Sequence, residues 1–178
     1  GKKEHKMGWN AQPTRMITFD DVEVPISHRL GEEGQGFAIA MEGLDGGRIN
    51  IATCSVGTAQ QALEDAQAYV SDRKQFGQAI ADFQNTQFKL ADMVTELVAA
   101  RQMIRLAASK LDAGDSQAST YCAMAKRFAT DVGFKVCNDA LQLFGGYGYI
   151  REYPVERYVR DTRVHQILEG TNEVMRVI

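Results

Sequence analysis

Apolar residues recur at helical spacing through most of the chain from residue 37 onward. In the first such segment they step by four and three residues and so share one helix face: Ala52, Val56, Ala59, Leu63, Ala66 and Val70. This face predicts a helix over residues 37–71. Three glycines in its first third, Gly43, Gly46 and Gly47, each cost about 1 kcal/mol relative to alanine in a helix. They indicate either a place where another helix or a ligand comes close, or a break between two helices.

Two further apolar faces predict a second and a third long helix. The second follows Leu90, Val94, Leu97, Ile104, Ala108 and Leu111, and stops at residues 113–114. The third follows Tyr121, Ala125, Phe128, Val132, Val136 and Leu143. Asp115 or Ser116 can cap its start, and the Gly145-Gly146 pair can end it, because glycine readily terminates a helix.

Shorter elements follow the third helix. Pro154 suits the first turn of a short helix through Tyr158, and Thr171 suits the N-cap of a last helix that reaches Ile178. Long helices joined by short loops predict an all-α fold. We expect an antiparallel up-and-down four-helix bundle over residues 37–178, with its last helix cut short.

The first 36 residues have a different pattern. Residues 14–19 and 22–24 are rich in Thr, Ile, Val and Phe and partly alternate with polar residues, which predicts one or two strands. The second of these segments ends at Pro25, and a polar, glycine-rich linker follows at residues 31–36. We therefore divide the chain into a β tail and linker at residues 1–36 and a helical domain at residues 37–178.

The composition fits one globular domain and argues against several functions. The 178 residues are 44% hydrophobic, and 20 basic against 23 acidic residues leave a net charge of −3, so no general attraction to nucleic acid is expected. No apolar run reaches the roughly 18 residues of a membrane span. The scattered Cys54, Cys122 and Cys137 indicate small core residues of a reducing compartment. The histidines are isolated, so no metal site is expected, and His165 is expected to be structural.

Candidate chemistry gathers near the end of the chain, at Glu169. Gly170 permits a sharp turn, and Thr171 with Glu173 suits a helix start, so Glu169 lies where a carboxylate can be aimed. Its two predecessors are apolar, which favours a dry setting. The alternative is a surface acid beside the start of a helix.

Three further segments can bind a ligand. Arg73 follows the first long helix and suits a phosphate, because a guanidinium makes paired charged hydrogen bonds; the alternative is a solvated basic loop. The Gly145-Gly146 pair allows close approach of a planar or phosphate-bearing ligand, or simply ends the helix. Arg48 lies either at a ligand pocket or in a surface ion pair with Glu42 or Asp45.

Two segments carry a resemblance to a known family. The run GGYGY at residues 145–149 and the run RDTRVHQILEGTNEVMRVI at residues 160–178 resemble the C-terminal part of the acyl-CoA dehydrogenases, and most of all their isobutyryl-CoA dehydrogenase branch. The likeness covers essentially the whole chain. It implies that the chain is a fragment, whose first 36 residues are the tail of the family's middle β-domain. Cut from its partner strands, this tail is expected to leave Trp9 exposed.

The resemblance also assigns roles to residues. In the family, the glutamate that matches Glu169 removes the α-proton of an acyl thioester while the β-hydride passes to FAD. Residues expected at FAD are Arg73, Phe83, Gln84, Gln142, Leu143, Phe144, Gly145, Gly146, Thr171, Asn172 and Glu173; of these, Arg73 and residues 142–146 reach the FAD of a neighbouring subunit. Residues expected at the acyl-CoA are Asp45, Gly46, Gly47, Arg48 and Gly170. In the isovaleryl-CoA branch the glutamate stands at the position of Gly47 instead.

The implied function is FAD-dependent α,β-dehydrogenation of a short, branched acyl-CoA such as isobutyryl-CoA. Leu168 supports the branched substrate, because many linear-chain members have a larger tyrosine there. The implied partners are an electron-transfer flavoprotein and three further copies of the chain, in a dimer of dimers. The implied location is the cytoplasm of a bacterium or the mitochondrial matrix of a eukaryote. Two alternatives stay open: an acyl-CoA oxidase of similar fold, and a helical assembly module that is inactive alone.

Overall fold

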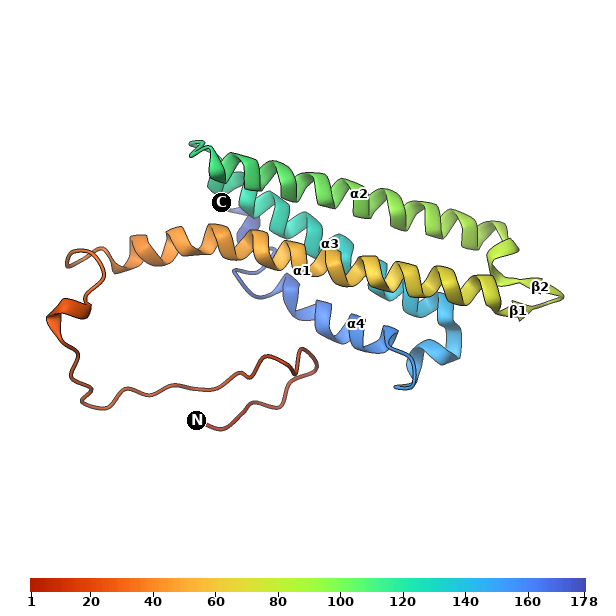
Figure 1. Cartoon of the computed structure of the whole chain (residues 1–178), viewed down its shortest axis with the longest axis horizontal. Helices are drawn as coiled ribbons and strands as arrows, with labels where there is room; N and C mark the ends of the chain where they lie inside the picture. The colour runs from red at the N-terminus through yellow and green to blue at the C-terminus, as the bar shows by residue number, and fades with distance from the viewer.

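Three long helices dominate the structure, a computed structural model that describes all 178 residues. They are α1 (Gly36–Asp72), α2 (Gln84–Asp112) and α3 (Ala118–Phe144), and they run alternately up and down beside one another (Figure 1). A shorter helix, α4 (Val155–Thr162), packs against α3 and α1. The predicted all-α bundle is confirmed. No helix combines the length and the apolar character needed to cross a bilayer.

The remaining elements are short. A two-stranded antiparallel hairpin joins α1 to α2, with β1 (Lys74–Gln75) paired to β2 (Gln78–Ala79). Five 3₁₀ turns complete the chain: η1 (Ile26–His28), η2 (Ile80–Asp82), η3 (Gly145–Tyr149), η4 (Arg163–Gln166) and η5 (Val174–Arg176).

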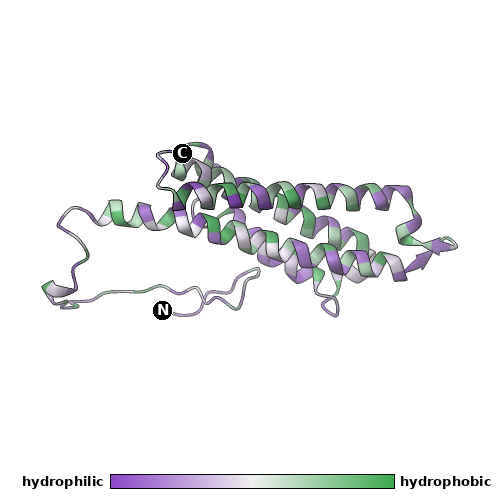
Figure 2. Ribbon diagram, turned by 45° about the horizontal axis from the view of Figure 1, so that its top comes forward, coloured by the Kyte–Doolittle hydropathy of each residue, from purple (hydrophilic) through white to green (hydrophobic).

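The core between α1, α2 and α3 is built largely from small side chains. All six residues predicted for the α1 face are buried, and half of them are alanines. Alanine and glycine let helix backbones come close: a Cβ at Gly133 of α3 would lie 2.9 Å from the Cβ of Ser55 on α1. Apolar and polar positions alternate around each long helix in Figure 2, as expected for helices with one buried side.

The second and third helices bury a face close to the predicted one. On α2 the buried apolar residues are Met93, Leu97, Ala100, Ile104 and Ala107, whereas Val94 is 41% exposed, so its predicted core position is wrong. Among the cysteines, Cys122 and Cys137 are buried as expected, but Cys54 is exposed.

Helix α1 runs through its three glycines without a break. The predicted alternative of two separate helices is therefore wrong. A Cβ at Gly43 or Gly46 would meet nothing within 4 Å, whereas a Cβ at Gly47 would meet the side chain of Glu169. Close approach thus explains one of the three glycines, Gly47.

The end of the chain departs from the prediction. Helix α4 runs four residues past the predicted end at Tyr158, and no helix begins at Thr171. The Thr171 hydroxyl accepts a hydrogen bond from the Val174 amide at 3.4 Å, but only the 3₁₀ turn η5 follows. This segment buries Met175 against α3.

The predicted strands at residues 14–19 and 22–24 do not form. This region is extended and exposed, and its one sheet-like contact is a bridge between Lys3 and Arg15. Strands need partners for their backbone groups, and no other strand of the chain lies beside these residues (Figure 1). The expectation that Trp9 is exposed is also wrong, because the Trp9 ring is half-buried, edge-on to His165 at 5.2 Å.

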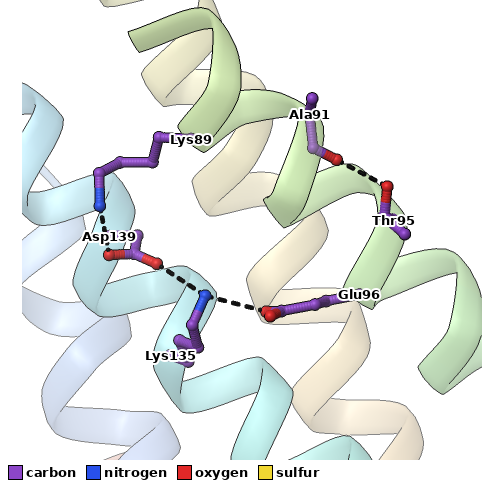
Figure 3. Close-up of polar contacts among 6 residues, drawn as sticks. All are labelled: Lys89, Ala91, Thr95, Glu96, Lys135 and Asp139. Atoms are coloured by element: carbon purple, nitrogen blue, oxygen red, sulfur yellow. Dashed lines mark hydrogen bonds and ion pairs between the residues drawn. The ribbon is translucent and has the colours of Figure 1, made fainter. Parts of the chain in front are cut away.

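Ion pairs tie α2 to α3 along their outer side (Figure 3). The Lys89 ammonium lies 2.9 Å from Asp139, and Lys135 bridges Glu96 at 3.1 Å and Asp139 at 3.2 Å. The Lys135 side chain is half-exposed, so each contact contributes modestly, at about 1 kcal/mol or less. The network helps to hold the two helices in register.

Candidate active site

Glu169 lies on a strained turn between η4 and η5. Its φ is +58°, and the φ of Gly170 is +90°, so two consecutive residues adopt left-handed backbone conformations. A non-glycine residue in this region costs about 1–3 kcal/mol and persists where its surroundings hold it. The sequence-based expectation of a tight turn that aims Glu169 fits this geometry.

The Glu169 side chain points at helix α1, where Gly47 makes room for it. A Cβ at position 47 would lie 2.8 Å from Glu169 Cδ and 3.2 Å from Oε1. Glu169 itself is half-buried. Because residue 47 has no side chain, α1 leaves a space there, and the Glu169 carboxylate occupies it.

A cavity of about 590 Å³ opens beside Glu169. Its wall combines apolar side chains with a few charged ones, and among the residues that line it are Ile51, Val164, Ile167, Leu168, Arg163 and Trp9. This volume is in the range of small-molecule sites in proteins. A carboxylate at the edge of a largely apolar cavity is placed to act on a ligand inside it.

The N-terminal segment forms the far side of this cavity. The backbone N–H of Trp9 donates to Asp161 Oδ1, and the Arg160 guanidinium donates to the carbonyl of Met7 at 3.1 Å. Gly8 lies between them, where a Cβ would be 2.6 Å from the carbonyl carbon of Arg160. Residues 7–9 are therefore docked on α4. Sequence reasoning missed this contact, because nothing distinguishes Gly8 from the other glycines before the segments meet.

Lys126 is the second residue that sequence reasoning missed. Lys126 is a residue of α3, and its side chain is fully buried. Its ammonium donates to the carbonyl of Gly170 at 2.7 Å and to Asn172 Oδ1 at 2.9 Å. Burial lowers the pKa of Lys126 to about 8, against the opposing effect of nearby carboxylates. Asn172, expected at the cofactor, is buried in this network.

The acyl-CoA candidates on α1 are divided between two settings. Gly47 faces Glu169, whereas Arg48 points into the bundle and pairs with Asp45 at 2.6 Å. Both charged residues are buried, and Ser119 also donates to Asp45. The pairing of Arg48 with Asp45 was expected only as a surface contact. Neither residue lines the cavity beside Glu169.

A second cavity, of about 460 Å³, lies at the other end of α1. Five of the residues expected at FAD line it: Arg73, Leu143, Phe144, Gly145 and Gly146. The Arg73 guanidinium lies 5.4 Å from the ring centroid of Tyr147, and Phe144 stacks on Tyr69 at 4.1 Å. A cation, aromatic faces and bare glycine backbone meet here, which is a setting for a planar, phosphate-bearing ligand.

Six of the cofactor candidates lie outside this second cavity: Phe83, Gln84, Gln142, Thr171, Asn172 and Glu173. Gln142 and Gln84 are exposed, and Phe83 packs edge-on against Phe76 at 6.3 Å. A smaller polar pocket of about 170 Å³ is lined by Thr171, Asn172 and Glu173 together with Asp131, Arg163, Gln166 and Arg176. Backbone and Thr171 hydrogen bonds lower the pKa of Glu173.

The two cavities of one chain are far apart. Gly47 lies in the first third of α1 and Arg73 caps its C-terminal end. A rise of 1.5 Å per residue separates them by about 39 Å along the helix. The Arg73 cavity and the Glu169 cavity therefore cannot form a single small-molecule site within one chain.

His165 lies between α1 and Trp9, as a structural histidine would. It is buried, and its Nδ1 lies 2.7 Å from the Ser55 hydroxyl, while its Nε2 has no partner in the chain. Burial lowers the pKa of His165. No three acidic, histidine or cysteine side chains gather as a metal-binding group.

Comparison with known proteins agrees with this architecture. The family model described as "Acyl-CoA dehydrogenase, C-terminal domain" matches residues 34–178. The mitochondrial isobutyryl-CoA dehydrogenase of Dictyostelium discoideum is 60% identical over all 178 residues, which cover 43% of its own length. The solved structure of butyryl-CoA dehydrogenase from Megasphaera elsdenii is similar over the whole chain, with 49% identity and a TM-score of 0.97, and the match covers 46% of that protein. A structure described as an electron transferring flavoprotein of Acidaminococcus fermentans reaches a TM-score of 0.97 at 50% identity, over 99% of this chain and 46% of that one.

The chain thus spans a little under half the length of the proteins it matches. Within that span the family match and the fold agree from residue 34 to the last residue. The chain belongs to the acyl-CoA dehydrogenase family, a family of flavin-dependent oxidoreductases.

Proposed function

We propose that the complete protein catalyses FAD-dependent α,β-dehydrogenation of a short, branched acyl-CoA, with Glu169 as the base. The observation that carries the proposal is the placement of Glu169: a left-handed turn aims its carboxylate at Gly47, beside a cavity of about 590 Å³. The similarity to an isobutyryl-CoA dehydrogenase supports the substrate class.

In this proposal Glu169 removes the α-proton of the acyl thioester. The thioester carbonyl must then be polarised while enolate character develops, by a donor already in place. The backbone N–H of Glu169 has no hydrogen-bond partner in the chain and serves as such a donor. The apolar wall of the cavity excludes water and holds the substrate near the carboxylate.

The cavity at Arg73 fits part of FAD. The Arg73 guanidinium suits a pyrophosphate. A Cβ at Gly145 or Gly146 would meet no atom within 4 Å, so both positions leave open space for a ligand. Phe83 and Gln84 extend this binding surface at the start of α2. Thr171 and Glu173 line the smaller polar pocket and would hold the cofactor on the side of the base. FAD supplies the acceptor for the β-hydride.

The distance between the two cavities supports assembly from several copies. Because about 39 Å of α1 separates Gly47 from Arg73, Arg73 and residues 142–146 serve the FAD of a neighbouring copy. We therefore propose a homotetramer built as a dimer of dimers. An electron-transfer flavoprotein is the proposed electron acceptor, supported by the similarity to the Acidaminococcus fermentans structure. In a eukaryote the proposed location is the mitochondrial matrix, which the mitochondrial relative from Dictyostelium supports; in a bacterium it is the cytoplasm.

Leu168 bears on the choice of substrate. It lines the cavity directly before Glu169 and leaves more room than an aromatic side chain for a methyl group at the α-carbon. Turnover of isobutyryl-CoA should therefore exceed that of butyryl-CoA when both are measured on the complete protein. A clear preference for butyryl-CoA rejects the branched-chain assignment.

Replacement of the base tests the reaction itself. In Glu169→Gln, FAD should remain bound, while the loss of flavin absorbance on addition of isobutyryl-CoA should disappear. The amide has nearly the same shape as the carboxylate but cannot accept the proton. Undiminished loss of absorbance in this variant removes Glu169 from the role of base.

A further inference from the structure

The Lys126 side chain is buried on α3, beside the turn that carries Glu169. Burying a charge is costly unless it is hydrogen-bonded. Lys126 meets this need with two acceptors, the carbonyl of Gly170 in the turn at 2.7 Å and Asn172 Oδ1 just after the turn at 2.9 Å. A buried cation is thus attached to the residue that directly follows Glu169.

The turn has few other bonds to hold it. Glu169 and Gly170 both adopt left-handed conformations, yet the N–H and C=O of Glu169 and the N–H of Gly170 make no hydrogen bond within the chain. The nearest backbone bond that closes the turn runs from the Asn172 amide to the Gln166 carbonyl at 3.0 Å. Of the polar backbone groups of Glu169 and Gly170, only the Gly170 carbonyl is bonded, and its partner is Lys126.

The second partner of Lys126 is itself fixed to α3. Asn172 is buried, and its Nδ2 donates to Asp131 Oδ1 at 2.7 Å and to the Thr130 hydroxyl at 2.9 Å. Its Oδ1 therefore faces Lys126 in one orientation. Gln166, on the other side of the turn, also donates to Asp131, at 2.8 Å. Helix α3 thereby holds the chain on both sides of Glu169, at Gln166 and at Asn172.

We propose that Lys126 is a positioning residue, which ties the Gly170 carbonyl to α3 and so keeps the Glu169 carboxylate aimed across Gly47 into the cavity. This inference rests on the proposed function of Glu169 as the base. Lys126 acts through Gly170 and Asn172, whose oxygens accept the hydrogen bonds of its ammonium.

The charges around Lys126 make this tie sensitive to pH. Asp131 on α3 and Glu169 and Glu173 on the terminal segment favour the ammonium, whereas Arg48 on α1 and burial oppose it. Burial dominates and lowers the pKa to about 8. As the pH rises through this value, the charged hydrogen bond to Gly170 weakens. Proton abstraction by Glu169 should slow over the same range.

The test compares three variants of the complete, FAD-loaded protein. Lys126→Met keeps the length of the side chain without its charge, Lys126→Arg keeps the charge, and Lys135→Met removes an exposed lysine of the same helix. The measurements are the rate of flavin reduction by isobutyryl-CoA between pH 6.5 and pH 10, and the hydrogen exchange of the Asn172 amide. Misplacing a catalytic group by 1 Å can cost about a hundredfold in rate.

In Lys126→Met, flavin reduction should be at least tenfold slower than in the wild type, and its rate should no longer fall near pH 8. The hydrogen exchange of the Asn172 amide should be faster. Lys126→Arg should recover part of the rate and shift its fall to higher pH, and Lys135→Met should match the wild type. A Lys126→Met variant within twofold of the wild type, with the same pH profile, overturns the inference. Should Lys126→Met fail to fold, a wild-type rate that does not fall between pH 7 and pH 9.5 overturns it equally.

The outcomes also separate this inference from the function on which it rests. If Glu169→Gln reduces flavin as fast as the wild type, the proposed function fails. If Glu169→Gln is inactive while Lys126→Met keeps the wild-type rate and pH profile, only the role of Lys126 fails.

Discussion

The carboxylate of Glu169 fills the space that a side chain at position 47 would take, with Glu169 Cδ only 2.8 Å from the Cβ position of residue 47. The two residues come from distant parts of the chain and meet across α1 and the terminal turn. Glycine at 47 is thus a condition for the placement of the carboxylate. Its cost in helix stability, about 1 kcal/mol relative to alanine, is offset by the contact it permits.

Gly47→Ala should therefore lower activity without unfolding the protein. The new methyl group forces the Glu169 carboxylate to shift, and a shift of 1 Å can slow proton abstraction about a hundredfold. Stopped-flow measurement of flavin reduction by isobutyryl-CoA gives the rate. Gly43→Ala is the matched control on the same helix, since a Cβ there meets nothing within 4 Å; it should keep the wild-type rate. Equal rates in both variants contradict the role given to Gly47.

A carboxylate carried by α1 should partly replace the one on the turn. Glu169→Gly removes the base and should be inactive, while the double variant Gly47→Glu with Glu169→Gly points a carboxylate from α1 toward the vacated space. We expect the double variant to recover measurable flavin reduction at a rate below the wild type, because the new side chain leaves the helix at a different angle. A double variant as inactive as Glu169→Gly indicates that the two positions do not reach the same point.

Local periodicity explains which parts of the fold could be predicted. On α1 all six predicted residues are buried, because they step regularly by four and three residues along one helix face, although Ile51 and Ala62 are buried beside them. On α2, apolar residues stand in adjacent pairs, such as Met93 and Val94, and which member faces the core depends on the helix packed against it. Only the tertiary structure decides that Met93 is buried and Val94 exposed.

Features that depend on distant contacts could not be predicted. The composition of residues 14–24 is typical of strands, but strands form only where partners lie alongside. Lys126 stands in a helix where a lysine is usually solvated, and only the meeting of α3 with Gly170 and Asn172 explains its burial. The tight turn at Glu169 was predictable because its residues are contiguous, whereas the docking of Gly8 on α4 joins distant segments and was not.

The buried ion pair between Asp45 and Arg48 should be essential for stability. Asp45→Asn leaves the buried Arg48 guanidinium without its counter-charge, 2.6 Å away in the wild type. Breaking one side of such a pair costs about 3–5 kcal/mol. Urea unfolding monitored by circular dichroism measures this loss. Glu32→Gln is the control, since its pair with Arg29 is exposed and contributes at most about 1 kcal/mol. Comparable losses in the two variants contradict the structural role of Asp45.

Gly8→Ala should detach the N-terminal segment from α4. The added methyl group would lie 2.6 Å from the backbone of Arg160, which cannot move away as a flexible side chain can. Trp9, the only tryptophan of the chain, should then leave its place against His165. Its fluorescence emission should move to longer wavelengths as the ring meets water. Gly36→Ala, where a Cβ meets nothing within 4 Å, should leave the spectrum unchanged. An unshifted spectrum in Gly8→Ala rejects the docking contact.

His165 should make the fold sensitive to mild acid. Burial lowers the pKa of His165 in the native state. The ordinary pKa of histidine is about 6.5. Below that pH the imidazole therefore binds a proton more readily in the unfolded chain than in the native one. Stability is therefore fully present above that pH and is lost as the pH falls through the native pKa. Urea unfolding at pH 7.5 and pH 5 should show a larger loss for the wild type than for His165→Gln, which cannot titrate. His28→Gln, at an exposed position, controls for the loss of a histidine as such and should behave like the wild type. Equal losses in the wild type and His165→Gln show that other groups set the response of the bundle to acid.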